Sequence, residues 1–598
     1  MEKILNQISK IMSDAFAECG YDAAYGKTGI SNRPDLCEYQ CNGAMAAAKV
    51  YKKAPFMIGD EVVAKLSDNP AFARIECIKP GFINIVLSEQ FVGDYIRKMT
   101  TEDKFGYEAK DGSETVLLDY GGANVAKPLH IGHLRSAVIG ESLKRINAYA
   151  GYKTIGDVHL GDWGLQMGLI IMELKERKPE LPYFDDSFTG EYPTEAPFTI
   201  SELEEIYPTA SGKSKAVDAD GNPTPEGLAF KKAAQEATVM LQNGHRGYTA
   251  IWKHILTVSI ADLKKNYGNL NVSFDLWKGE SDAQQYIPDM IDDLINRKIA
   301  YESQGAIVVD IAEEGDSKEL PPCIVRKSDG GANYETSDLG TLIEREKLYA
   351  PSKYIYLADK RQDLHYTQFF RVARKAGIVR PETELKFIGF GTMNGKDGKP
   401  FKTRQGGVLR LEYLIQEIND AVYAKIMENR TVDENEARDT ARIVGLAALK
   451  YGDLSNQAAK DYIFDIDRFA SFEGDTGPYI LYTIVRIKSI LKKYIEQGGT
   501  VETDAINNPS SESEKSLMLE LTKFTEMIDS ALEESAPHKV CKFIYDLSNA
   551  FNHFYHETKI LSEEDETKKK GYIALINLTK DVLGTCIDLL GIEAPERM

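Results

Sequence analysis

One stretch of ten residues, Asn-Val-Ala-Lys-Pro-Leu-His-Ile-Gly-His at 124–133, constrains the fold of this chain more than any other. A compact β-rich run at 115–118 precedes it, and apolar residues recur at helical spacing over 134–149 after it. We therefore expect a strand, a turn and a helix in that order. The free N–H groups at a helix start favour phosphate, and Gly132 lets a ligand approach the backbone closely. The pattern predicts a nucleotide site.

Two histidines in this stretch, His130 and His133, are candidate catalytic residues. Their imidazoles can donate hydrogen bonds to charge that develops on a reacting phosphate. The alternative is that both side chains only cap the helix. A second strand and a glycine-rich turn at 153–164 complete a β-α-β unit, whose ligand crevice lies at the carboxyl ends of the strands.

The residues around the histidines resemble a known signature, that of class I aminoacyl-tRNA synthetases in its arginyl-tRNA synthetase form. The resemblance rests on Asn124, Lys127, Pro128, His130, His133 and Arg135. It implies a ligase that charges tRNA(Arg) with L-arginine through an arginyl-adenylate formed from ATP, with Mg²⁺ accompanying the ATP. It also implies ATP contacts at His130, Gly132, His133, Gly161 and Asp162. Where the family often has Ser-Ser-Pro this chain has Gly-Gly-Ala at 121–123, so hydroxyl contacts do not carry over.

The length and composition bound the organisation of the chain. At about 150 residues per domain, 598 residues predict three or four domains, and 43% hydrophobic with 27% charged residues is typical of a soluble globular protein. No apolar run approaches the roughly 18 residues of a membrane span, and the N-terminus lacks a signal-peptide core. We expect a cytoplasmic protein that has no membrane contact and is a monomer.

Seven scattered cysteines fit neither a disulfide framework nor paired zinc ligands, so no protein-bound zinc or other metal site is expected. The formal net charge of −20 argues against indiscriminate nucleic-acid binding. It leaves room for a tRNA partner that is recognised by local basic patches.

Three domains are predicted from the periodicity and the resemblance together. Residues 1–112 form a small α+β N-terminal domain that binds the tRNA elbow, 113–430 an α/β Rossmann-like catalytic domain, and 431–598 an all-α anticodon-binding bundle. Within the catalytic domain, 183–227 is rich in Pro, Ser, Thr, Gly and acids. It has no clear period and is interpreted as an insertion without an assigned role.

Five residues are implied to bind arginine: Asp119, Asn124, Tyr334, Asp338 and Gln362. A guanidinium is planar and permanently charged, and is best held by bidentate carboxylates with a flat aromatic partner. The alternative for the two aspartates is a strand-end carboxylate and a helix cap.

A cationic loop at 394–407 is predicted to fold over the triphosphate, with Lys402 and Arg404 as catalytic residues. Other class I synthetases carry Lys-Met-Ser-Lys-Ser in this loop, whereas this chain has Phe-Lys-Thr-Arg-Gln at 401–405, so the final lysine of the motif is missing. Lys127 is the candidate for the absent cation. An ordinary solvated basic loop is the alternative.

Five residues are candidates for tRNA contact, because unpaired bases need stacking faces and cations. They are Phe82, Asn84, Tyr479, Arg486 and Tyr555. The alternative is that these aromatics belong to the domain cores. Rival functions are another class I synthetase, a small nucleotidyltransferase, which would not need the helical C-terminal domain, and a non-catalytic tRNA-binding paralogue, which would not keep the histidines.

Overall fold

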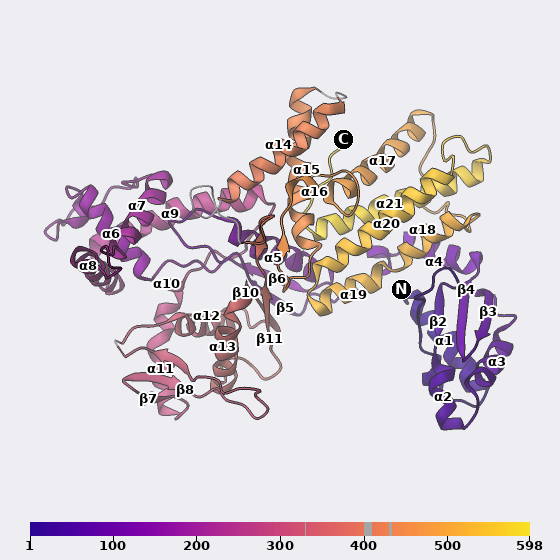
Figure 1. Cartoon of the computed structure of the whole chain (residues 1–598), viewed down its shortest axis with the longest axis horizontal. Coiled ribbons are helices and arrows are strands. Elements are labelled where there is room, and N and C mark those ends of the chain that lie inside the picture. Colours follow the sequence, from indigo (N-terminus) through magenta and orange to yellow (C-terminus); the bar gives the residue numbers. More distant parts are fainter. Residues whose placement is uncertain (329, 400–409, 430–432) are drawn as a thin grey trace.

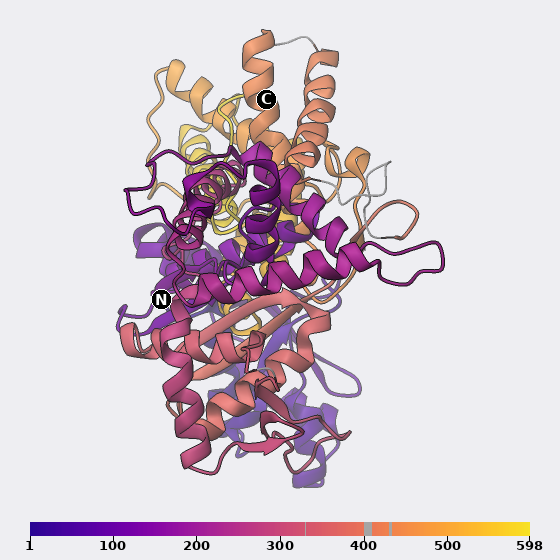
Figure 2. The same ribbon diagram turned by 90° about the vertical axis from the view of Figure 1, so that its left-hand side faces the viewer.

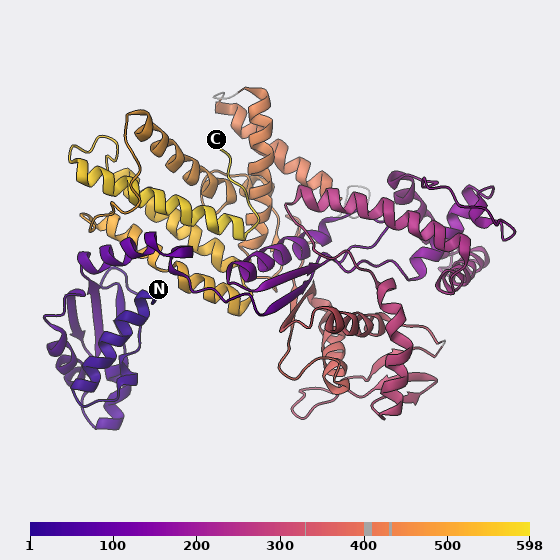
Figure 3. The same ribbon diagram turned by 180° about the vertical axis from the view of Figure 1, so that it is seen from behind.

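The computed structural model of the chain describes residues 1–328, 330–399, 410–429 and 433–598. Figure 1 shows three bodies: a small N-terminal α+β unit, a central parallel sheet with its associated helices, and a C-terminal helical bundle. The predicted fold class is confirmed. Seen from behind, the N-terminal unit touches the rest of the molecule at the bundle (Figure 3), where Lys515 forms an ion pair with Glu38 at 2.7 Å.

The N-terminal unit is an antiparallel four-stranded sheet of order β1-β2-β4-β3 covered by helices. Ile83, Ile85 and Leu87 of β4 are buried in the core of this unit, as expected for a sheet with one face on helices. Its elements are α1 (Ile4–Glu18), β1 (Thr28–Ile30), β2 (Tyr39–Cys41), α2 (Gly43–Tyr51), α3 (Pro55–Leu66), β3 (Phe72–Ile78), β4 (Phe82–Leu87) and α4 (Glu89–Thr101).

The central sheet is parallel, with strand order β11-β10-β5-β6. Strands β5 and β10 lie side by side and each begins one half of the sheet, so their carboxyl ends form the switch point at which α/β folds bind ligands. The expected strand–turn–helix at the signature is present. The elements are β5 (Thr115–Asp119), α5 (Ile131–Tyr149), β6 (Lys153–Asp157), α12 (Tyr334–Leu348), β10 (Lys353–Asp359), α13 (Asp363–Ala376) and β11 (Glu384–Phe390).

Between the two halves of the sheet the chain makes a group of helices, which faces the viewer in Figure 2, and a small antiparallel sheet. These elements are α6 (Leu165–Arg177), α7 (Ile200–Ser214), α8 (Pro225–Gln242), α9 (Arg246–Asn269), α10 (Glu280–Ala283), α11 (Ile287–Asn296), β7 (Tyr301–Ser303), β8 (Ala306–Val309) and β9 (Cys323–Arg326). The interpretation of 183–227 as a stretch without a period was wrong for α7. Leu203, Ile206 and Ala210 are buried at helical spacing, and a Thr199–Glu202 capping box starts the helix, although Pro208 and the polar composition hide the pattern.

The C-terminal part is helical apart from β13 (Tyr462–Ile463), which pairs with β12 (Met393–Asn394) of the catalytic part. The helices are α14 (Leu411–Asn429), α15 (Glu434–Leu454), α16 (Ile466–Phe469), α17 (Gly477–Glu496), α18 (Glu512–Thr522), α19 (Phe524–Glu534), α20 (Pro537–Glu557) and α21 (Glu566–Leu589). Ile480, Ile484, Ile487 and Leu491 are buried on one face of α17, which is consistent with the predicted all-α bundle.

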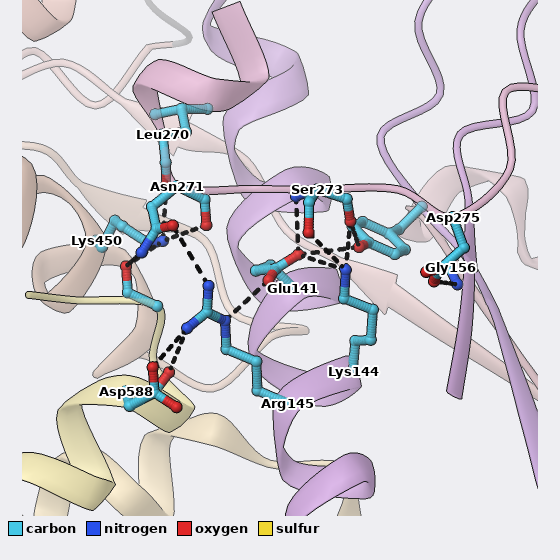
Figure 4. Close-up of polar contacts among 12 residues, drawn as sticks. Glu141, Lys144, Arg145, Gly156, Leu270, Asn271, Ser273, Asp275, Lys450 and Asp588 are labelled. Atoms are coloured by element: carbon cyan, nitrogen blue, oxygen red, sulfur yellow. Dashed lines mark hydrogen bonds and ion pairs between the residues drawn. The ribbon is translucent and has the colours of Figure 1, made fainter. Parts of the chain in front are cut away.

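A buried polar network joins the bundle to the catalytic part (Figure 4). The side chain of Lys450 on α15 is fully buried, and its Nζ donates to the carbonyls of Leu270 (2.8 Å) and Gly591 (2.7 Å). Beside it, Arg145 on α5 bridges Glu141 (2.8 Å) and Asp588 on α21 (2.7 Å). A buried polar group without a partner is costly, so this network fixes how the two parts dock.

Candidate active site at the start of helix α5

Both signature histidines cap helix α5, and they do so through the same ring atom. Nδ1 of His130 accepts a hydrogen bond from the Gly132 N–H at 3.0 Å, and Nδ1 of His133 accepts one from the His130 N–H at 3.1 Å. An imidazole that accepts at Nδ1 carries its proton at Nε2. Both side chains therefore cap the helix, and capping leaves each Nε2–H as a donor.

Both imidazoles are held neutral. Burial lowers the pKa of His133 to about 3, with a smaller contribution from His130. Burial, and then the charge of Lys127, lowers the pKa of His130. The rings lie 3.9 Å apart between centroids. At neutral pH the start of α5 thus presents two neutral N–H donors beside one lysine.

Lys127 reaches this site from the preceding turn, and its Nζ lies 4.5 Å from the ring centroid of Tyr207 on α7. Arg410, immediately before α14, donates to Glu204 of α7 at 2.9 Å. Lys402 and Arg404 lie outside the described residues, as does Gln405.

A second charged cluster surrounds Asp338 on α12. The imidazole of His365 bridges two carboxylates, with Nε2 2.6 Å from Asp338 and Nδ1 2.9 Å from Glu335. Although burial opposes it, the two acids raise the pKa of His365 to about 9. Nε2 of His159 is 3.7 Å from the other carboxylate oxygen of Asp338, and His159 has a left-handed φ of 43°. His365 is therefore a cation at neutral pH, and neither this role nor that of His159 was predicted.

Asp119, at the end of β5, faces the same region but already holds a guanidinium. Arg345 donates to Asp119 at 2.6 Å and to Asp157 at 2.7 Å, and its side chain is almost fully buried. Burial is the main cause that raises the pKa of Asp119, and Arg345 opposes it. Arg345 was not predicted because its partners lie 226 and 188 residues away, so no local pattern points to it.

The remaining predicted residues differ in whether their side chains are exposed or already engaged in contacts within the protein. Asp162 is buried and accepts hydrogen bonds from the N–H (3.0 Å) and hydroxyl (2.6 Å) of Ser281, so its carboxylate holds the start of α10. Asn124 and Gly161 pair as a short parallel bridge in which a Cβ on Gly161 would meet Asn124 Oδ1 at 2.2 Å. Tyr334 is 73% exposed at the start of α12, and Gln362 is also exposed.

Glu280, at the start of α10, is a further acidic group of this region that the sequence did not single out. Burial raises its pKa to about 7, His159 lowers it, and Asp162 and Asp338 raise it further. It is one residue after the turn glycine Gly279, which is its only local signal. Asp338, Glu335 and Glu280 thus bring three carboxyl groups to this region, beside the one imidazolium of His365.

Comparison with known proteins decides the family. Residues 96–466 match the family described as tRNA synthetases class I (R), catalytic domain. Residues 480–598 match the DALR anticodon binding domain, and residues 2–87 match the arginyl tRNA synthetase N terminal domain. The chain is 60% identical to an arginine–tRNA ligase of Agathobacter rectalis and 56% identical to one of Alkaliphilus oremlandii, with both chains covered completely in each case. The chain belongs to the arginine–tRNA ligase family.

A solved structure agrees with this assignment. The crystal structure of arginyl-tRNA synthetase from Plasmodium falciparum is similar with a TM-score of 0.79 and 25% identity, and both chains are covered completely. The predicted function, a class I enzyme that charges tRNA(Arg) with arginine, is confirmed at the level of the family. Class I synthetases use ATP. In the described residues of this family member, no group of three or more His, Cys, Asp or Glu could hold a metal, and no helix could cross a membrane.

The tRNA-binding predictions fall in two places. In the bundle, the guanidinium of Arg486 lies 4.8 Å from the Tyr482 ring and 5.2 Å from the Tyr555 ring, and it donates to Asn552. Tyr479 joins them, since its hydroxyl accepts from Asn552 at 3.0 Å. In the N-terminal unit, Phe82 is half-buried, while Asn84 is only 5% exposed and accepts from Gln40 at 2.9 Å. The bundle set is a connected, partly exposed cluster, whereas Asn84 is engaged within its sheet.

Proposed function

We propose that this chain charges tRNA(Arg) with L-arginine, using MgATP, through catalytic groups at the start of α5. In the first step an arginine carboxylate oxygen attacks the α-phosphorus of ATP in line and pyrophosphate leaves. His130 and His133 donate Nε2–H hydrogen bonds to the oxygens on which charge develops, and Lys127 adds a positive charge. The observation that supports this proposal is the capping geometry, because it commits both Nδ1 atoms and leaves the proton of each neutral ring at Nε2.

In the second step a hydroxyl of the terminal tRNA ribose attacks the carbonyl carbon of the adenylate, and AMP leaves. No side-chain nucleophile is required, since positioning and electrostatic stabilisation lower both barriers. The backbone around Gly132 and Gly161 is proposed to lie against ATP, while Asp162 supports that turn through Ser281. Lys402 and Arg404 are proposed to receive the departing pyrophosphate.

The arginine pocket is proposed to lie at the carboxyl ends of β5 and β10, with Asp338 as its main acid. The acidic surroundings of Asp338 and Glu280 suit a cationic substrate, and exposed Tyr334 offers a flat face to the guanidinium. Asp119 is proposed either to shape the pocket through its ion pair with Arg345 or to accept a hydrogen bond from the substrate at its second carboxylate oxygen. Asn124 and Gln362 are proposed as the polar contacts of the amino-acid end.

The N-terminal domain (residues 1–112) and the C-terminal domain (residues 431–598) are proposed to bind tRNA. The cluster of Arg486, Tyr479 and Tyr555 suits unpaired anticodon bases, because it combines rings and a cation on a partly exposed surface. Phe82 and Asn84 are proposed at the tRNA elbow. A monomer in the cytoplasm is also proposed; seven free cysteines suit a reducing compartment.

The decisive experiment is aminoacylation of total tRNA with each amino acid in turn. Arginine alone is expected to be charged, and charging by another amino acid would overturn the proposal. Retained tRNA binding without any charging would instead favour a non-catalytic paralogue. Transfer of a nucleotide to an acceptor other than an amino acid would favour a nucleotidyltransferase.

A further inference from the structure

Helix α7 belongs to the insertion that had no assigned role, yet it is anchored against the active site. Leu203 and Ile206 are buried in the main core, and the helix starts with the Thr199–Glu202 capping box. Two neighbouring residues of this helix, Glu204 and Tyr207, contact groups that flank the signature histidines. A capped helix with a buried face in this position indicates a role beyond connecting the two halves of the sheet.

Tyr207 contacts Lys127 through its ring face, 4.5 Å from centroid to Nζ. A carboxylate in this place would hold the ammonium more strongly, but it would also offset the charge that a phosphate needs. An aromatic face attracts a cation without carrying a net charge of its own. The ring therefore orients Lys127 and leaves its full positive charge to the nucleotide.

Glu204 holds the other side of the same site. Its side chain is largely buried and accepts from Arg410 at 2.9 Å. The backbone of Arg410 pairs with His130 in an antiparallel bridge, and the next residue, Leu411, donates its N–H to Leu129 at 3.0 Å. Fixing Arg410 thus fixes the backbone that borders the catalytic histidine.

We propose that Tyr207 and Glu204 of α7 are positioning residues for adenylate formation: Tyr207 orients the Lys127 ammonium, and Glu204 holds Arg410 against the His130 backbone. This inference rests on the proposed function of Lys127. It assigns to the insertion a part in ATP activation, and it makes the effect of Tyr207 conditional on a lysine at position 127.

The test is a double-mutant cycle on arginine-dependent ATP–pyrophosphate exchange with tRNA present. Tyr207→Leu is expected to lower kcat/KM for ATP by about five- to tenfold, the size of a partly desolvated cation–π contact. In the Lys127→Met background the same substitution is expected to change it less than twofold. Tyr207→Phe keeps the ring face and is expected to retain at least half of the activity. Glu204→Gln is expected to lower kcat/KM for ATP about threefold in either background.

Tyr192→Leu is the matched control, because Tyr192 lies in the same insertion with its ring 4.8 Å from the Arg246 guanidinium and away from the signature. It is expected to leave exchange unchanged. An equal loss for Tyr207→Leu in both backgrounds, or no loss in either, would overturn the inference while leaving the role of Lys127 intact. A silent Lys127→Met would overturn the proposed role of Lys127 itself. If Tyr207→Leu does not fold, Tyr207→Met keeps a long apolar side chain and replaces it in the cycle.

Discussion

Two pairs of histidines in this molecule have pKa values that are shifted in opposite directions. Burial lowers the pKa values of His130 and His133, and the positive charge of Lys127 adds to the shift. His159 and His365 face carboxylates, and their pKa values are raised. One side-chain type thus gives neutral donors at the proposed nucleotide site and a cation at the proposed arginine site.

The difference shows how neighbours choose the chemistry of an imidazole. A neutral N–H donor stabilises charge that appears on phosphate during the reaction, without binding the ground state as tightly as a cation would. At the acidic cluster, the imidazolium of His365 lies between the carboxylates of Glu335 and Asp338 and offsets the repulsion between them.

Removing a neutral donor should produce the largest effect. His130→Ala or His133→Ala is expected to slow adenylate formation by about 10²- to 10³-fold, the usual cost of one transition-state donor. Pyrophosphate exchange measures this rate, and filter binding of tRNA provides the control, which should barely change. A parallel loss of tRNA affinity would contradict the assignment to chemistry.

The second-largest effect is expected from removing the carboxylate of Asp338, which His365 and His159 face. Asp338→Asn keeps the shape but loses the charge, and we expect a loss of about 2–4 kcal/mol in kcat/KM for arginine. Steady-state charging at varied arginine and varied ATP separates the two substrates, and the KM for ATP should hardly move. An unchanged arginine KM would leave Asp338 as a structural partner of His365 only.

The third prediction concerns Lys127, whose positive charge contributes to the lowered pKa of both signature histidines. Lys127→Ala is expected to lower the activation rate by roughly tenfold or more, with little change in the KM for arginine. Gln405→Lys restores a lysine to the cationic loop and should recover part of this loss. Single-turnover adenylate formation is the measurement, and failure of the rescue would assign Lys127 a structural role.

The smallest effect is expected from replacing His365, as a pH-dependent change in thermal stability. His365→Gln removes a cation whose pKa in the folded protein, about 9, exceeds the ordinary value of about 6.5. The stabilisation from its carboxylate contacts is fully present below pH 6.5 and is lost as the pH rises through 9. The variant should therefore unfold at a lower temperature than the parent near pH 6, by about 2–4 °C for each kcal/mol lost, and at nearly the same temperature above pH 9. Trp163, Trp252 and Trp277 report the catalytic part by fluorescence. A difference independent of pH would mean that His365 only packs.

Local patterns predicted much of this structure. The strand predicted at 115–118 lies within β5, the helical spacing over 134–149 lies within α5, and the second strand expected within 153–164 is β6. These elements are encoded by nearby residues. Helix α7 escaped notice because Pro208 and its small polar residues mask three buried positions. Arg345, His365 and Glu204 could not be predicted, because each acts through a partner brought close only by the folded chain.

The buried side chain of Lys450 has a consequence for the order in which the protein completes its folded contacts. Its carbonyl partners are Leu270, which precedes it by 180 residues, and Gly591, which follows it by 141 residues. Because domains generally fold from the N-terminus onward during synthesis, the partner on the catalytic side is in place well before Gly591 has been made. The docking of the helical bundle on the catalytic part is therefore completed only after the segment that carries Gly591 has been synthesised.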